Sequence, residues 1–261
     1  MKKVTIKKIQ NKKNKIPIVC VTAYTKSIAQ IADKYCDIIL VGDSLGMVLY
    51  GMKTTREVTI DIMIHHAKAV KKFTKKSLVV FDMPYKSYKN KFVAYSNAKK
   101  VIEITKCDAV KLEGGKKVAN IIKYLTKKKI RVMGHVGLLP QTTTSFKVKG
   151  KNTEEEKKIY NDAKTVSDSG AFAIIIECVV EKLAKKITKN IAVPTIGIGA
   201  SKYCDGQILV TDDMLGLSDF NPKFVKKYSN LKKTIGLSLM KYAKEVRSRK
   251  FPSNKNVYNK N

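Results

Sequence analysis

The sequence lacks several features that would assign it to a class at once. Its five cysteines are scattered and form no Cys-x-x-Cys pair, which argues against a disulfide framework or a zinc site and favours a reducing, cytoplasmic location. No segment approaches the ~18 apolar residues of a membrane span. A full Gly-x-Gly-x-x-Gly loop is also missing, since "GIGAS" at 197–201 matches it only partly.

Arginine is scarce although the net charge is +32. Four of the 53 basic residues are arginines, which leaves 53 − 4 = 49 lysines. Arginine is the residue that clamps phosphates and reads bases with its planar fork, so an excess of lysine along the whole chain favours a solvated surface. A lysine-rich nucleic-acid-binding protein remains the alternative from a different class, although no recognisable nucleic-acid-binding motif is present.

Short apolar runs alternate with segments of helical periodicity, which predicts a parallel sheet covered by helices. Eight units in 261 residues favour an α/β fold of the (β/α)₈ TIM-barrel type, with an open doubly wound sheet as the alternative. The expected strands are Ile18–Val21, Ile38–Val41, Leu78–Phe81, Ala109–Leu112, Arg131–Met133, Phe172–Ile176, Pro194–Ile198 and Gln207–Val210.

Two of the expected helices are especially clear. The segment 59–73 repeats apolar residues at helical spacing, and 153–170 begins with a Thr153/Glu156 capping-box spacing and ends at Gly170. We expect a single barrel domain over 1–261, with a C-terminal helical segment at about 222–248 and a polar tail at about 251–261.

Polar residues stand where the expected strands end, and in a barrel those positions open onto one face, where active sites of this fold lie. Three carboxylates together need a cation or a proton to coexist, and oxygen donors suit a hard divalent ion, most naturally Mg²⁺. A helix N-cap is the bland alternative for any single acid. The polar residues at the expected strand ends are Asp43, Ser44, Asp82, Lys111, Glu113, His135 and Glu177.

The block "GDSL" at 42–45 raises the question of which atom is chemically active. Hydrolases with such a block need a downstream histidine base for the serine, but none follows His135. Asp43 as a metal ligand is therefore favoured over Ser44 as a nucleophile. Lys111 alternates with apolar neighbours and should point into the barrel, His65 and His66 are expected to be structural, and His135 could be either structural or functional.

Eight ordered blocks give the chain a family resemblance that covers nearly its whole length. They are "VGDSLGMVLYG", "MIHHAKAV", "DMPYKSY", "AVKLEGG", "VMGHVGLLPQ", "GAFAIIIECV", "PTIGIGAS" and "CDGQILV". Together they resemble ketopantoate hydroxymethyltransferase. The chain departs from the usual pattern at Val180, where proline is common, and at Ser201, where glycine is common.

The resemblance implies a barrel of the phosphoenolpyruvate/pyruvate-like group that transfers a hydroxymethyl group from 5,10-methylenetetrahydrofolate to 3-methyl-2-oxobutanoate through a Mg²⁺-stabilised enolate, in pantothenate biosynthesis. Another Mg²⁺-dependent carbon–carbon lyase or transferase on a 2-oxo acid is the closest alternative. The resemblance also implies one Mg²⁺ per subunit and a cytoplasmic homo-oligomer, a decamer or similar ring, without nucleic-acid or membrane partners.

The same resemblance assigns roles to individual residues. It implies metal ligands at Asp43, Asp82 and Glu113, the last either directly or through water, and a catalytic base at Glu177. Substrate contacts are implied at Asp43, Ser44, Asp82 and Lys111.

Overall fold

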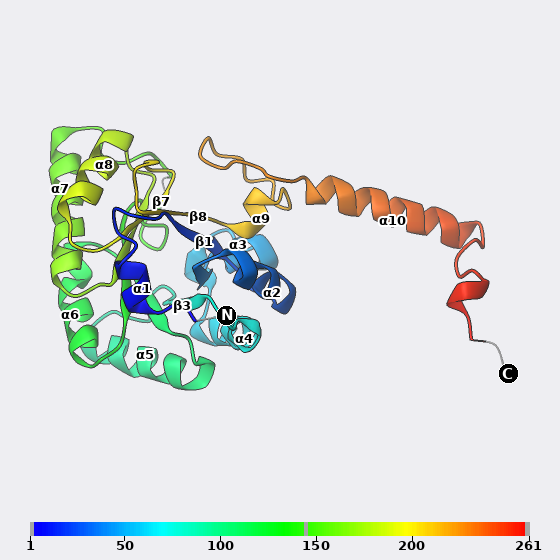
Figure 1. The fold of residues 1–261 in the computed structure, drawn as a ribbon, viewed down its shortest axis with the longest axis horizontal. Helices are drawn as coiled ribbons and strands as arrows, with labels where there is room; N and C mark the ends of the chain where they lie inside the picture. Colours follow the sequence, from blue (N-terminus) through cyan, green and yellow to red (C-terminus); the bar gives the residue numbers. More distant parts are fainter. Residues whose placement is uncertain (1–2, 144–145, 259–261) are drawn as a thin grey trace. The chain divides into compact units, whose positions relative to one another are not determined.

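The computed structural model describes residues 3–143 and 146–258. Eight parallel strands close into a barrel in sequence order, β1 through β8, which confirms the expected TIM barrel (Figure 1). Each observed strand overlaps its expected range. The strands are β1 Ile18–Thr22, β2 Ile38–Val41, β3 Leu78–Asp82, β4 Ala109–Glu113, β5 Val132–Gly137, β6 Ala173–Glu177, β7 Thr195–Ile198 and β8 Gly206–Leu209.

Helices follow the first six strands and pack around the barrel (Figure 1). The division of the chain into two compact units falls between Thr211 and Asp212, and the barrel belongs to the first unit. A single domain over the whole chain stays a prediction. The α-helices are α1 Ile6–Gln10, α2 Lys26–Tyr35, α3 Leu45–Tyr50, α4 Ile60–Phe73, α5 Lys91–Thr105, α6 Ala119–Lys127, α7 Thr153–Asp168, α8 Glu181–Asn190, α9 Thr211–Met214 and α10 Leu231–Arg247; the 3₁₀ turns are Thr55–Glu57, Lys116–Val118 and Asn254–Asn256.

Strand alternation divides the buried side chains between two apolar clusters. In β4, Ala109 belongs to the cluster inside the barrel, whereas Val110 and Leu112 belong to the one between strands and helices. Lys111 and Glu113 take the remaining inward positions, because they share the parity of Ala109. The inward positions of this strand are thus apolar at its start and charged at its carboxyl end.

The helix at 153–168 begins one residue earlier than the expected capping box requires. Its N-cap is Asn152, whose side chain accepts a hydrogen bond from the Glu155 amide at 2.8 Å, so the expected Thr153/Glu156 capping box is wrong. Asparagine caps at least as well as threonine, and with Asn152 in the extended cap conformation Thr153 becomes the first helical residue. Gly170, with φ +95°, terminates the segment as expected.

The C-terminal unit is built on the long helix α10, which occupies only the later part of the expected segment 222–248. The helix starts at Leu231, because Asn230 caps it by accepting a hydrogen bond from the Lys233 amide, and residues 222–230 form no helix. No residue of α10 is buried. Within the described residues, no helix is both long and apolar enough to cross a membrane.

The excess of lysine lies at the surface. Among the described residues, Lys111 is the only buried lysine. This distribution marks Lys111 as the exception that needs a physical reason.

Candidate active site

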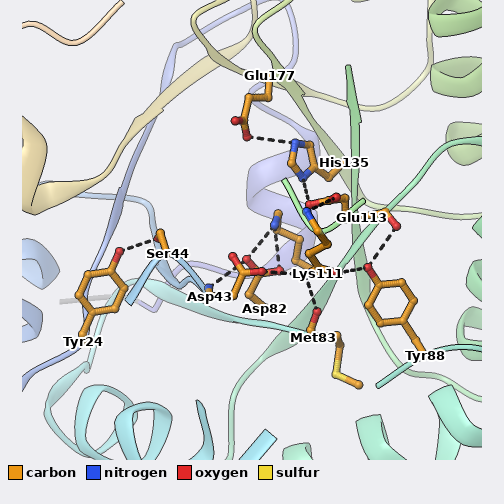
Figure 2. A network of polar contacts seen from close by, with 11 residues as sticks. Tyr24, Asp43, Ser44, Asp82, Met83, Tyr88, Lys111, Glu113, His135 and Glu177 are labelled. Carbon is orange, nitrogen blue, oxygen red and sulfur yellow. Dashed lines mark hydrogen bonds and ion pairs between the residues drawn. The ribbon is translucent and has the colours of Figure 1, made fainter. Parts of the chain in front are cut away.

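The candidate residues lie at the carboxyl ends of neighbouring strands, and the strand register brings them together. Asp82 of β3 pairs with Lys111 of β4, and Glu113 of β4 pairs with His135 of β5. Figure 2 shows these side chains in one connected network that extends to Glu177 at the end of β6. The expected convergence of strand-end residues on one face of the barrel is therefore observed.

Lys111 and Asp82 form a buried ion pair. The Lys111 Nζ donates to both carboxylate oxygens of Asp82 at 2.8 Å. Burial disfavours the ammonium, but the negative charges of Asp82, Asp43 and Glu113 outweigh it, so the pKa of Lys111 is raised. Lys111 points into the barrel, as expected from its alternation with apolar neighbours.

Asp43 and Glu113 carry more negative charge than the single ammonium can balance. Burial and the charge of Asp82 raise the pKa of Asp43 to about 7, against the opposing effects of Lys111 and Gln141. Burial likewise raises the pKa of Glu113 well above its usual range, partly offset by Lys111. The electrostatics of the site therefore favour the binding of an additional positive charge.

His135 is fully enclosed between two carboxylates. Its Nε2 lies 3.2 Å from Glu177 Oε2, and its Nδ1 lies 3.6 Å from Glu113 Oε2. Neither nitrogen makes a hydrogen bond of good geometry within the described part of the chain. Burial, followed by the charge of Lys111, lowers the pKa of His135, which keeps the imidazole neutral at pH 7.

Ser44 lacks the surroundings of a hydrolytic nucleophile. Its Oγ lies 2.8 Å from the hydroxyl of Tyr24, and no histidine hydrogen-bonds to it within the described residues. His66 instead contacts the Tyr24 carbonyl at 2.7 Å and the Tyr50 hydroxyl at 2.9 Å, which fits the structural role expected for it. The geometry thus disfavours Ser44 as a base-activated nucleophile.

Three contributors to the network were not anticipated from the sequence. Tyr24 contacts Ser44, the Tyr88 hydroxyl lies 3.2 Å from the Glu113 carbonyl oxygen, and the side chain of Gln141 donates to Asp43 at 2.8 Å. They come from loops beyond the strands, where strand periodicity gives no information. The only sequence signal was that Tyr88 and Gln141 lie inside blocks that carry the family resemblance, whereas Tyr24 lies outside them.

Val180, at a position where proline is common in the pattern, is the N-cap of α8 with φ −53°. Proline could adopt this φ, but it has no amide hydrogen. Here the Val180 amide donates to the Lys149 carbonyl at 3.0 Å, and the Lys149 amide donates to the Cys178 carbonyl at 2.7 Å. The departure therefore adds one hydrogen bond next to the Glu177 loop.

A closed parallel barrel with acids and a lysine at the carboxyl ends of its strands defines a TIM-barrel enzyme. Residues 3–254 match the family model described as ketopantoate hydroxymethyltransferase. The chain belongs to this family and is a transferase.

Relatives agree with this assignment, and a solved structure shares the fold. The chain is 56% identical over 255 residues to 3-methyl-2-oxobutanoate hydroxymethyltransferase of Pelagibacter ubique (strain HTCC1062), covering 97% of this chain and 99% of the relative. It is 52% identical to the enzyme of the same name from Rhizobium etli, covering 97% and 94%. A phosphonopyruvate hydrolase in complex with oxalate and Mg²⁺ shares the fold, with a TM-score of 0.62, 11% identity and coverage of 97% and 93%.

The raised pKa of Asp43 predicts how the stability of the metal-free protein depends on pH. A carboxyl group with a folded-state pKa of about 7 holds its proton in the fold and loses it on unfolding, so stability falls as pH rises between about 4 and 7. Asp43→Asn should remove part of this loss and be more stable than wild type at pH 8, by on the order of 2–4 kcal/mol.

Urea unfolding of both proteins between pH 4 and pH 8 tests this prediction. Asp61→Asn, which removes an exposed carboxylate on α4, is the matched control and should follow the wild-type curve. Parallel curves for wild type and Asp43→Asn would contradict the assignment of this proton to Asp43.

Proposed function

We propose that this transferase moves a hydroxymethyl group from 5,10-methylenetetrahydrofolate to 3-methyl-2-oxobutanoate, giving 2-dehydropantoate and tetrahydrofolate in pantothenate biosynthesis. The observation that carries the proposal is the buried cluster of Asp43, Asp82, Lys111 and Glu113 at the barrel's carboxyl end, with Glu177 beside it. Overall, the C3–H bond of the oxo acid is replaced by a C3–CH₂OH bond, and water supplies the hydroxyl oxygen.

The donor set suits Mg²⁺ by type and by charge. Asp43, Asp82 and Glu113 offer only oxygen atoms, and their charge exceeds that of Lys111. In the described residues no three acids already converge as a metal cage, since Asp82 directs both oxygens to Lys111. Asp43 and Asp82 would hold the ion directly and Glu113 through water, and bound Mg²⁺ supplies stabilisation of the negative charge that develops on the keto oxygen.

Two residues would fix the carboxylate of the oxo acid. The Ser44 hydroxyl, at the start of α3, and the Lys111 ammonium are both hydrogen-bond donors at the barrel's carboxyl end. By anchoring the carboxylate, they would orient C3 towards the base, which lowers the entropy cost of reaction.

Glu177 is the proposed base for the C3 proton. It is the last residue of β6, shares the inward parity of Ala173 and Ile175, and its side chain keeps 18% of its surface exposed. A carboxylate that is neither fully buried nor paired with a lysine stays free to accept a proton from a bound substrate. His135 Nε2 lies 3.2 Å from Glu177 Oε2 and limits the positions of the Glu177 carboxylate.

Proton NMR in deuterated water tests the proposal. With Mg²⁺ present, 3-methyl-2-oxobutanoate should lose its C3 proton signal, and 2-dehydropantoate should form once methylenetetrahydrofolate is added. Omission of Mg²⁺ is the control and should abolish both changes. Exchange without this product would favour another Mg²⁺-dependent lyase or transferase on a 2-oxo acid, and absence of exchange would overturn the proposal.

We further propose a homo-oligomer in the form of a ring, a decamer or similar assembly. Helix α10 supports it because the helix carries exposed apolar side chains and no buried residue. These side chains are Ile235, Leu237, Leu239, Met240, Tyr242 and Val246. Sedimentation equilibrium measures the number of subunits, and a monomer at micromolar concentration would contradict the proposal.

A further inference from the structure

Gln141, in the segment after β5, is completely buried and uses every polar group that it has. Its side-chain Nε2 donates to Asp43 Oδ2 at 2.8 Å and to the Met83 carbonyl at 3.0 Å, and its Oε1 accepts from the Tyr88 hydroxyl. Its backbone amide donates to Glu113 Oε1 at 2.9 Å. One residue thus holds an oxygen of each of two carboxylates, one just after β2 and the other at the end of β4.

The orientation of the Gln141 amide is determined by its partners. The Met83 carbonyl and the ionised form of Asp43 can only accept, so they require the NH₂ group, whereas the hydroxyl of Tyr88 donates to the oxygen. A flipped amide would lose the hydrogen bonds to Asp43 and the Met83 carbonyl and place its oxygen against both of these acceptors. Gln141 is therefore held in one state.

Gln141 is itself anchored by Arg56. The Arg56 Nε donates to the backbone carbonyl of Gln141 at 3.0 Å, and the guanidinium lies 5.7 Å from the centre of the Tyr85 ring. Arginine can combine a directed Nε–H with stacking on a ring, which the flexible ammonium of lysine cannot do. The chain has 49 lysines and only four arginines (53 − 4 = 49). An arginine at this position is therefore notable, because its side chain can hold the Gln141 backbone in a fixed orientation.

We propose that Gln141 is a positioning residue that fixes the carboxylates of Asp43 and Glu113 for the divalent cation. This inference rests on the proposed function. Two like-charged carboxylates in a buried site repel each other, and without a donor between them each would turn towards Lys111 or solvent. Gln141 occupies one oxygen of each acid and thereby limits their rotation before the cation arrives, as outer-shell partners of metal ligands do.

The test is calorimetric titration of the purified protein with Mg²⁺ alone, in the absence of substrates. Gln141→Leu keeps a similar volume and the backbone amide, but it loses the side-chain donors and acceptor. We expect its Mg²⁺ dissociation constant to rise by about 10–100-fold. Turnover should recover largely when Mg²⁺ is raised, a split between affinity and maximal rate that general damage to the fold would not produce.

Gln207→Leu is the control: Gln207 is an exposed residue of strand β8 whose side-chain amide donates to the Ser201 carbonyl, at 2.9 Å, instead of to an acid. Its Mg²⁺ affinity should equal that of wild type. Equal affinities of wild type and Gln141→Leu would overturn the inference, whereas a wild type that binds no Mg²⁺ would overturn the proposed function itself. If Gln141→Leu does not fold, Tyr88→Phe decides, since it removes the donor to Oε1, and unchanged Mg²⁺ affinity there would equally overturn the inference.

Discussion

Replacement of Glu177 by glutamine is expected to slow C3 proton exchange of 3-methyl-2-oxobutanoate by about 10²–10⁴-fold. Glutamine keeps the shape of the side chain and can still face His135 Nε2, which lies 3.2 Å from the Glu177 carboxylate. The amide oxygen, however, has no useful basicity at neutral pH. The loss should therefore appear in the maximal rate and leave Mg²⁺ affinity unchanged, because Glu177 is not a proposed metal ligand.

The same exchange experiment, followed by proton NMR in deuterated water, measures the effect. Glu181→Gln is the matched control: this exposed glutamate lies four residues further on, in the first turn of α8, and its loss should not change the rate. Exchange by Glu177→Gln within about threefold of wild type would be too small for a lost general base and would reassign the proton transfer.

The periodicity of apolar residues in strands and helices predicted most of the fold. All eight expected strands are present, because fully buried parallel strands appear in the sequence as continuous apolar runs. The predictions were wrong at two helix starts, because a single polar capping residue determines where a helix begins. Asn152 took the cap expected at Thr153, and Asn230 started α10 well inside the segment 222–248.

The site was predictable to the extent that strand register determines it. Asp82, Lys111, Glu113 and His135 occupy paired positions on three consecutive strands, so their convergence follows from the barrel. Gln141 could not be foreseen in the same way, because it follows β5 in an irregular loop and its buried position depends on contacts with distant segments. Loops have no period that would reveal such contacts.

Removal of the Lys111 charge is expected to have the largest effect on stability. Lys111→Met keeps most of the apolar stem but leaves Asp82, Asp43 and Glu113 without their cation. Loss of one partner of a buried pair costs about 3–5 kcal/mol, so the free energy of unfolding at pH 8 without Mg²⁺ should fall by that amount. Lys123→Met, an exposed change on α6, is the control.

The dependence of this loss on pH identifies its cause. The raised pKa of Lys111 means that its stabilising charge is fully present below its usual pKa of 10.5, so the wild-type ammonium acts unchanged from pH 5 to pH 8. In the variant, the unpaired carboxylates can take up protons as pH falls, and the difference from wild type should shrink towards pH 5.

A second change separates electrostatics from packing. Combination of Lys111→Met with Asp82→Asn removes both members of the buried pair and should recover much of the lost stability in urea unfolding at pH 8. A loss that is independent of pH and not relieved by Asp82→Asn would mean that Lys111 supports the barrel by packing alone. Recovery would mean that the charge of Lys111 stabilises the fold by balancing the buried acids.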